Sequence, residues 1–323
     1  MSREAAPFSA ASPQNSQAAS ASASSPDNPY PTPASEAAPD AEKPLRATCE
    51  CCPHRCAIAP GATGVCRARA NGDGRVVDEN YGRVTSVAVD PIEKKPLARF
   101  RPGTQVLSVG SYGCNLRCPW CQNYCIAQAG AAQVPWRSLS PQELAATAAD
   151  MAASDPEVTG VAYTYNEPLC GWEYVRDCAR LVHGAGLCNV LVSNGCFEAP
   201  VIEAVAPLMD AVNIDLKCFN EPGYRQIGGD LECVKAAIAT FAATPTCHVE
   251  VTSLIVPGFN DSPEEMDAQC RWLAQLDPSI VLHITRFFPA YRCTQVGPTP
   301  LEDIYRLTHI ARTHLQWVYT GNC

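Results

Sequence analysis

The feature that most constrains the fold is a regular alternation of short β-rich apolar runs with helical stretches, which begins near Gln105. The apolar runs lie at residues 106–109, 158–163, 187–193, 211–216, 248–256 and 281–286. The helical stretches lie at residues 141–153, 171–184, 200–205, 231–243, 263–275 and 301–314, and a short final strand is expected at 317–319. Several of these stretches start near Pro or Ser and end near Gly, as helix boundaries prefer. The alternation predicts an α/β fold with a parallel sheet and right-handed crossovers.

Polar groups follow the carboxyl ends of the predicted strands. In parallel α/β sheets, ligands bind at these ends. The groups are, in chain order, Cys114, Asn166-Glu167-Pro168, Ser193-Asn194-Gly195, Asp215-Leu216-Lys217, Pro257-Gly258-Phe259-Asn260 and Arg286-Phe287-Phe288-Pro289. A chain without a common site would scatter such groups over both edges of the sheet. We therefore expect a single large active site at this edge.

The loop after the first of these strands contains three closely spaced cysteines, Cys114, Cys118 and Cys121, at C-x3-C-x2-C spacing. Three such thiolates can hold three irons of a [4Fe–4S] cluster, which leaves the fourth iron open to a substrate or cofactor. The alternatives are a zinc knuckle or a chance spacing in a Cys-rich chain, but the position after the first strand favours the cluster. If Cys125 were a fourth ligand, its thiolate would occupy the open iron, so we expect Cys125 not to bind the cluster.

This spacing, with an aromatic residue just before the third cysteine, resembles the signature of the radical SAM (S-adenosylmethionine) superfamily. Further segments extend the resemblance to the radical SAM enzymes of the AmmeMemoRadiSam system, which are relatives of pyruvate formate-lyase activating enzyme. These segments are residues 90–97, 121–123, 255–261, 283–289 and 318–322. The resemblance covers about residues 48–323 and implies a partial (β/α)6 TIM-like barrel.

The resemblance also implies how S-adenosylmethionine would be bound. Glu167 would accept hydrogen bonds from the methionine amino group, with Asn166 and Tyr165 at positions where the family has glycines. Asp215 and Lys217 match an Asp-x-Lys element in which Lys217 would bind the methionine carboxylate. The alternative for these two residues is a buried ion pair.

Two other strand ends would contact the rest of this cofactor. Ser193 and Asn194 would lie near the ribose, although Val192 stands where the family's activating enzymes have Asp. Pro257 and Gly258 would lie near the adenine. A further departure is Thr252, which replaces an Arg of those enzymes.

A second group of cysteines precedes the barrel. Cys49, Cys52, Cys56 and Cys66 fall within a short segment, and this spacing predicts a closed metal site that binds either zinc or a second Fe–S cluster. His54 could replace one of these ligands. The alternative is that the cysteines are unligated thiols.

Composition divides the chain into three parts. Residues 1–47 are rich in Ala, Ser and Pro and cannot bury enough apolar area to offset their ordering entropy, so we expect a disordered tail. Residues 48–100 form a small Cys-rich module. The resemblance implies that residues 101–323 form the radical SAM core domain.

Charge and cysteine content narrow the function classes. A net charge of −9 and a pI of about 5.2 argue against a nucleic-acid partner and a membrane-surface partner. No run of apolar residues is long enough for a transmembrane helix. The chain has 19 cysteines but neither the small size nor the leader of a secreted disulfide protein, so we expect a reducing, cytoplasmic location.

We therefore expect a radical SAM enzyme that cleaves S-adenosylmethionine reductively to a 5′-deoxyadenosyl radical, which takes hydrogen from a substrate. The kinship suggests a glycyl-radical-activating reaction on a protein partner, with a reductant such as flavodoxin or ferredoxin. One alternative is radical SAM modification of another protein or of a small molecule. An alternative of another class is an Fe–S electron carrier or a metal-binding scaffold.

Overall fold

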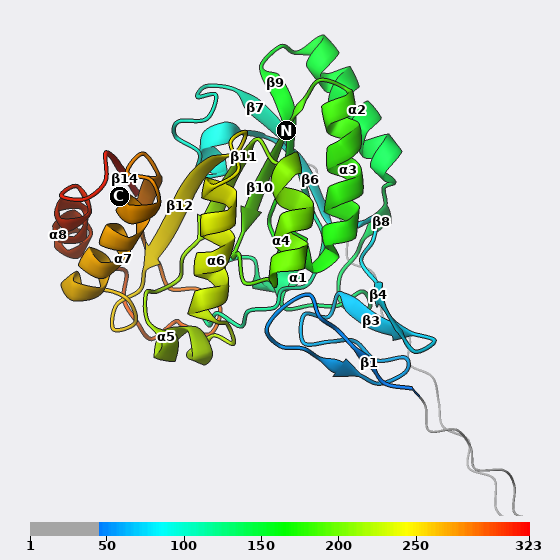
Figure 1. The fold of residues 1–323 in the computed structure, drawn as a ribbon, viewed down its shortest axis with the longest axis horizontal. Coiled ribbons are helices and arrows are strands. Elements are labelled where there is room, and N and C mark those ends of the chain that lie inside the picture. The colour runs from blue at the N-terminus through cyan, green and yellow to red at the C-terminus, as the bar shows by residue number, and fades with distance from the viewer. Residues whose placement is uncertain (1–44) are drawn as a thin grey trace, which may run out of the picture. The chain divides into compact units, whose positions relative to one another are not determined.

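The computed structural model describes residues 45–323, so most of the expected tail lies outside the described residues. Its last residue, Ala47, already belongs to strand β1 (Ala47–Thr48), which pairs with β2 (Ala57–Ile58). A second hairpin joins β3 (Arg69–Gly72) to β4 (Arg75–Asp78). Its turn residues Asp73 and Gly74 both have positive φ, as the tightest hairpin turns require. These strands build the amino-terminal module (Figure 1).

The main sheet has eight strands in the order β14-β13-β12-β11-β10-β9-β7-β6. The strands from β7 to β14 that belong to this sheet are parallel, and β6 (Ser86–Pro91) pairs antiparallel with β7. Their bounds are β7 (Gln105–Gly110), β9 (Val158–Tyr163), β10 (Cys188–Ser193), β11 (Ala211–Asp215), β12 (His248–Ile255), β13 (Val281–Arg286) and β14 (Trp317–Gly321). The two outer strands are not paired with each other, so the sheet forms an open, partial barrel. The predicted fold class is thus confirmed.

Strand β6 falls within residues 48–100, so the end of that segment pairs with the main sheet. Two short strands, β5 (Arg83–Val84) and β8 (Arg137–Ser138), form a small separate ladder beside it. Sequence reasoning missed β6, because this edge strand exposes Ala88 and Val89 and has no continuous apolar face.

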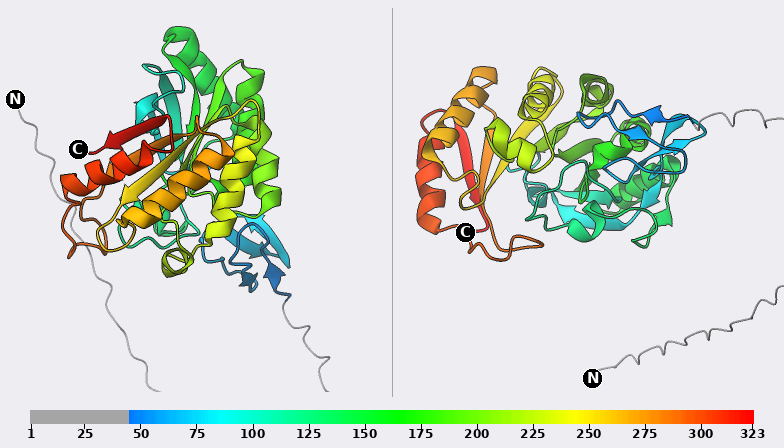
Figure 2. Two further views of the ribbon diagram at one scale, coloured as in Figure 1. Left: turned by 60° about the vertical axis from the view of Figure 1, so that its left-hand side comes forward. Right: turned by 90° about the horizontal axis from the view of Figure 1, so that it is seen from below.

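Helices cover one face of the sheet (Figures 1 and 2). The longer ones are α2 (Pro141–Ser154), α3 (Trp172–Gly184), α4 (Ala199–Val205), α6 (Leu231–Ala242), α7 (Pro263–Leu276) and α8 (Leu301–Ala311). Side-chain caps set several starts: Ser140 forms a capping box with Glu143, and Ser262 accepts from the Glu265 N–H. Two short helices, α1 (Tyr124–Ala127) and α5 (Glu221–Gln226), lie in loops after strands.

A segment that precedes β7 in the chain packs against the inner face of the sheet. The segment 92–100, which starts as the 3-10 helix η1 (Ile92–Lys94), lies against it. Ile92 and Leu97 are fully buried there against inner-face residues of β7, β9, β10 and β11, such as Ala162 and Val190. The outward-facing neighbours on these strands, such as Val161 and Leu191, belong to the larger core under the helices. Alternation along each strand therefore separates two cores.

Glu250 on β12 fixes this segment to the inner face. Its carboxylate is fully buried and accepts from the backbone N–H groups of Ala98 and Arg99, at 2.9 and 2.8 Å. It also bonds to the rings of His248 and His283. Burial alone would raise the pKa of Glu250, but these hydrogen bonds lower it to about 2. The segment is therefore held by an ionised carboxylate.

Replacing Glu250 by Gln should lower the free energy of unfolding by about 3 kcal/mol near neutral pH, because the favoured carboxylate is lost. This stabilisation is fully present above the unfolded pKa of about 4.3 and is lost as pH falls towards the folded value of about 2. Urea unfolding at several pH values should therefore show the difference between wild type and variant shrinking as the solution is acidified. Glu203→Gln, at an exposed position, is the control. A pH-independent difference would contradict this account.

Candidate active site

The predicted cysteine loop lies directly after β7 and is closed by α1. Leu116 donates its N–H to the Cys114 sulfur at 3.3 Å, Cys118 is buried, and Cys121 is half-buried. The loop begins at Gly113, whose φ of 91° favours glycine. Cys125 lies beyond it in α1 and is exposed. The three predicted cluster ligands thus lie in one loop, with Cys125 on the surface.

Glu167 and the third strand end form one hydrogen-bond network. The Glu167 carboxylate, only 3% exposed, accepts from the Leu169 N–H at 3.1 Å, the Ser193 hydroxyl at 2.8 Å and the Asn194 N–H at 2.8 Å. Burial raises the pKa of Glu167 to about 7, although the hydrogen bonds favour the carboxylate. Ser193 and Asn194, which were predicted to lie near a ribose, therefore use these donors to hold Glu167.

Asn166, predicted as a cofactor contact, directs its amide to the cysteine loop. Its oxygen accepts from the Ser111 N–H at 2.9 Å, and its nitrogen donates to the carbonyls of Tyr112 and Gly113, each at 3.1 Å. The structure thus uses this side chain to tie the second strand end to the start of the loop.

Asp215 and Lys217 form an ion pair at the fourth strand end, with 2.9 Å between the carboxylate and the ammonium nitrogen. Burial would lower the pKa of Lys217, but the negative charge of Asp215 and its hydrogen bond to the ammonium raise it above its ordinary value. Lys217 therefore carries its positive charge close to the cysteine loop. The ion pair, given above as the alternative for these two residues, is present.

The Pro257-Gly258 turn is tied to the same edge by Asn260. The Asn260 side chain, 5% exposed, accepts from the Val256 N–H at 2.7 Å and donates to the carbonyls of Lys217 and Leu254, each at 2.8 Å. Phe259 packs edge-on against Trp120 of the cysteine loop, with 4.6 Å between ring centroids. The fifth strand end is thereby placed beside both the fourth strand end and the loop.

Sequence reasoning missed Asn115, which joins the loop to the third strand end. Its amide nitrogen donates to the Cys196 carbonyl at 2.7 Å, and its oxygen accepts from the Asn194 amide at 2.9 Å. Asn194 also lies 3.7 Å from the Cys114 sulfur. The only sequence signal was the place of Asn115 between two of the loop cysteines, Cys114 and Cys118. That position does not indicate which groups the amide contacts.

Tyr165 was also missed as a structural link. It has a φ of 75°, which is unusual for a residue other than glycine. Its hydroxyl donates to Asp90 of β6 at 2.6 Å, its ring lies 4.8 Å from the Lys95 ammonium, and its carbonyl accepts from the Asn123 amide at 2.7 Å. The residue before Asn166-Glu167 is therefore anchored on two sides.

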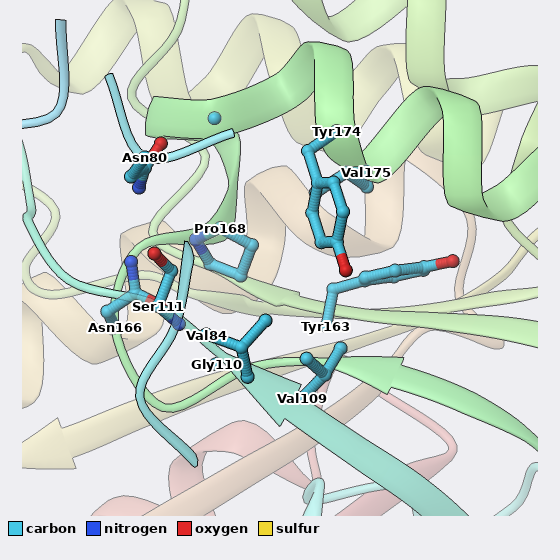
Figure 3. A pocket seen from close by; sticks show the side chains of 11 residues that line it. Asn80, Val84, Val109, Gly110, Ser111, Tyr163, Asn166, Pro168, Tyr174 and Val175 are labelled. Carbon is cyan, nitrogen blue, oxygen red and sulfur yellow. The ribbon is translucent and has the colours of Figure 1, made fainter. Parts of the chain in front are cut away.

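Two cavities lie away from the cysteine loop itself, and the smaller one borders the second strand end at Ser111 and Asn166. One of about 30 Å³ lies on the outer face of the sheet, under α3, lined mainly by apolar groups (Figure 3). That volume holds at most one or two water molecules. A larger cavity of about 570 Å³ lies at the amino ends of the strands, near Arg99, His248 and Trp317. It is at the opposite edge from the cysteine loop.

The amino-terminal cysteines predicted to bind a metal, Cys49, Cys52, Cys56 and Cys66, all line one cavity with His54. Within residues 45–323, no three His, Cys, Asp or Glu side chains already surround a single ion position. In a [4Fe–4S] cluster each thiolate binds a different iron, so its ligands need not share one ion. The donor set of Cys114, Cys118 and Cys121 therefore fits such a cluster.

Across residues 45–323, no helix combines the length and apolar character needed to cross a membrane.

Changing Asn260 to Asp should lower the free energy of unfolding by about 2–3 kcal/mol, because a carboxylate oxygen cannot donate to the two carbonyls that the amide nitrogen now serves. Urea unfolding measures the effect. Asn322→Asp, an exposed residue with a single long hydrogen bond of 3.4 Å, is the matched control and should change little. Equal effects of the two substitutions would show that Asn260 does not hold the turn.

Comparison with known proteins was made on sequence and on fold. A profile described as the Radical SAM superfamily matches residues 108–270. Uncharacterized protein MJ0808 of Methanocaldococcus jannaschii is 36% identical over 280 residues, 86% of this chain and 81% of that protein. The benzylsuccinate synthase activating enzyme of Thauera aromatica is 28% identical over 120 residues, 36% of this chain and 35% of that enzyme.

Among solved structures, SuiB of Streptococcus suis bound to S-adenosylmethionine has a TM-score of 0.51 at 13% identity, covering 68% of this chain and 52% of SuiB. A radical SAM methyltransferase from Sphaerobacter thermophilus has a TM-score of 0.50 at 19% identity, covering 68% of this chain and 67% of the methyltransferase. These two likenesses concern the fold alone. The profile match and the 36% identity over most of the chain show that this protein belongs to the radical SAM superfamily.

Proposed function

We propose that this protein is a radical SAM enzyme whose cluster is held by Cys114, Cys118 and Cys121. The superfamily implies a [4Fe–4S] cluster and S-adenosylmethionine; when bound, these supply reductive cleavage of the sulfonium to a 5′-deoxyadenosyl radical that takes hydrogen from a substrate. The observation that carries the proposal is the convergence of this loop, Glu167 and Lys217 at one edge of the sheet. Each group comes from a different strand end.

The buried acid and the lysine have separate roles in this proposal. Glu167 accepts hydrogen bonds from the methionine ammonium, and such a positive neighbour would favour the ionised form of its buried carboxyl. Lys217 binds the methionine carboxylate while Asp215 keeps its ammonium oriented. Ser193 and Asn194 act chiefly by fixing Glu167. Pro257 and Gly258 contribute the wall nearest the adenine.

This proposal predicts that the anaerobically reconstituted protein forms 5′-deoxyadenosine from S-adenosylmethionine and dithionite. Cys118→Ala should abolish the product, whereas Cys125→Ala should leave it unchanged because that thiol is exposed and lies beyond the cysteine loop in α1. Glu167→Gln should weaken cofactor binding by about 10- to 100-fold, since a hydrogen bond to a charged group is lost. Product from Cys118→Ala would reject the cluster assignment. If the spectrum of the reduced cluster does not change when S-adenosylmethionine is added, the protein is better described as an Fe–S electron carrier.

For the substrate, we propose the glycine Cα of a protein partner, with a flavodoxin- or ferredoxin-type reductant. The support is the similarity to a protein named as an activating enzyme, over 36% of this chain. Radical SAM modification of another protein or of a small molecule is the second candidate. We also propose a reducing, cytoplasmic location, because 19 cysteines in a chain of this size suit metal ligation and buried thiols better than a disulfide framework.

If the substrate is a glycyl-radical protein, a candidate encoded beside this chain should gain a glycine-centred radical when mixed with the reconstituted enzyme, reductant and cofactor. Electron paramagnetic resonance measures that radical. Replacing the candidate's reactive glycine by alanine is the control. Formation of 5′-deoxyadenosine with no such radical would favour the second candidate instead.

We further propose that Cys49, Cys52, Cys56 and Cys66 bind a second metal, either zinc or an Fe–S cluster. The support is their all-thiolate chemistry and their shared cavity.

A further inference from the structure

The amino-terminal cavity contains more than the four cysteines whose spacing suggests a metal site. Two further thiols line it: Cys51 of the module, and Cys170 of the 3-10 helix η2 (Pro168–Gly171), which belongs to the barrel. The cavity is small, about 10 Å³, and also contains Arg69 and Asn115. Six sulfur atoms from both parts of the fold therefore surround one small space.

Arg69 brings a positive charge to these thiols. Its side chain is 4% exposed and pairs with Glu173 of α3 at 2.7 Å. The same guanidinium donates to the Cys51 sulfur at 2.8 Å. Its Nε has no hydrogen-bond partner among the described residues. A buried guanidinium with unused donor capacity among sulfurs is suited to a centre that carries excess negative charge, as thiolate-ligated metals do.

Backbone N–H groups also point at sulfur in both cysteine groups. Val65 donates to the Cys56 sulfur at 3.4 Å, which parallels the 3.3 Å bond from Leu116 to Cys114 in the cluster loop. Such bonds stabilise thiolates and tune the metals that they bind. The two loops thus share a local feature that fits metal ligation.

The cavity wall is also the support of the proposed active site. His54 bonds to the Asn115 carbonyl of the cluster loop at 2.8 Å. A Cβ at Gly113 would lie only 2.5 Å from the Cys66 carbonyl oxygen, so the start of the loop rests directly on the module. Cys170 follows Glu167 by three residues in the turn that holds this carboxylate. A shift of the module cysteines would therefore displace both the cysteine loop and the turn that contains Glu167.

We infer that the thiols lining this cavity bind a metal centre, with Arg69 as a hydrogen-bond donor to its sulfurs, and that this centre fixes the cluster loop and the Glu167 turn in position for S-adenosylmethionine. The inference rests on the proposed function for the role of Glu167. Among the described residues no three of these side chains already surround one point, so metal binding would rearrange the thiols of the cavity. The centre would then position the site without taking part in the reaction.

Metal content tests the first half of this inference. The full chain with Cys114, Cys118 and Cys121 all changed to Ala lacks the cluster ligands, so metal that it retains after anaerobic purification belongs elsewhere. We expect either zinc alone or iron with sulfide, and cobalt substitution or Mössbauer spectra distinguish the two. Adding Cys52→Ala and Cys66→Ala should remove it. The control adds Cys178→Ala and Cys270→Ala, two buried thiols outside the cavity.

Cofactor binding tests the second half, in protein with an intact cluster loop. Cys52→Ala with Cys66→Ala should weaken S-adenosylmethionine binding in equilibrium dialysis by about 10-fold, the size expected for a lost supporting contact. The Cys178→Ala, Cys270→Ala protein should bind normally. Arg69→Met should also lose the second metal, and Arg69→Lys should retain it. These single variants provide the test if the cysteine variant does not fold.

Two results would overturn the inference. One is a protein without cluster ligands that retains neither zinc nor iron, even after reconstitution with each. The other is loss of the second metal with unchanged cofactor affinity. Neither result depends on 5′-deoxyadenosine formation, so a failure of the proposed reaction remains distinguishable from a failure of this inference.

Discussion

The arrangement of the carboxyl edge of the main sheet depends on the hydrogen bonds that the buried Glu167 carboxylate accepts. Removing a carboxylate from water is costly unless hydrogen bonds replace its hydration. Here the donors come from η2 and from the end of β10, so satisfying one side chain fixes two strand ends together. Asn194 then extends the same network to Asn115 and the cysteine loop. The site is therefore a connected polar layer built on a closely packed sheet.

That layer exists because the sheet has two different faces. The helix-covered face carries a continuous apolar core, while the inner face is apolar on β7, β9 and β10 and polar around Glu250. The segment 92–100 covers the inner face from the amino ends and is hydrogen-bonded there. Functional side chains remain at the carboxyl ends, where parallel α/β folds place their ligands.

Much of this arrangement was predictable from sequence. The runs 158–163 and 281–286 coincide with β9 and β13, because buried parallel strands read as continuous apolar segments. Their order placed Glu167 and Lys217 at the same edge as the cysteines. Sequence could not show where a polar side chain points: Asn166 serves the loop backbone, and Ser193 serves Glu167. Nor could it show β6, whose pairing depends on a partner strand and not on its own pattern.

Tyr165 links the edge strand β6 to the turn that contains Glu167. Its left-handed backbone carries a cost of about 1–3 kcal/mol for a residue with a side chain, and the phenol bond to Asp90 helps to offset it. Glycine would suit the backbone but would detach the turn from β6. Because side chains alternate between faces, a slip of β6 by one residue would carry Asp90 away from Tyr165. The register of this antiparallel edge strand is thus linked, through the Tyr165 phenol, to Glu167 two residues further along the chain.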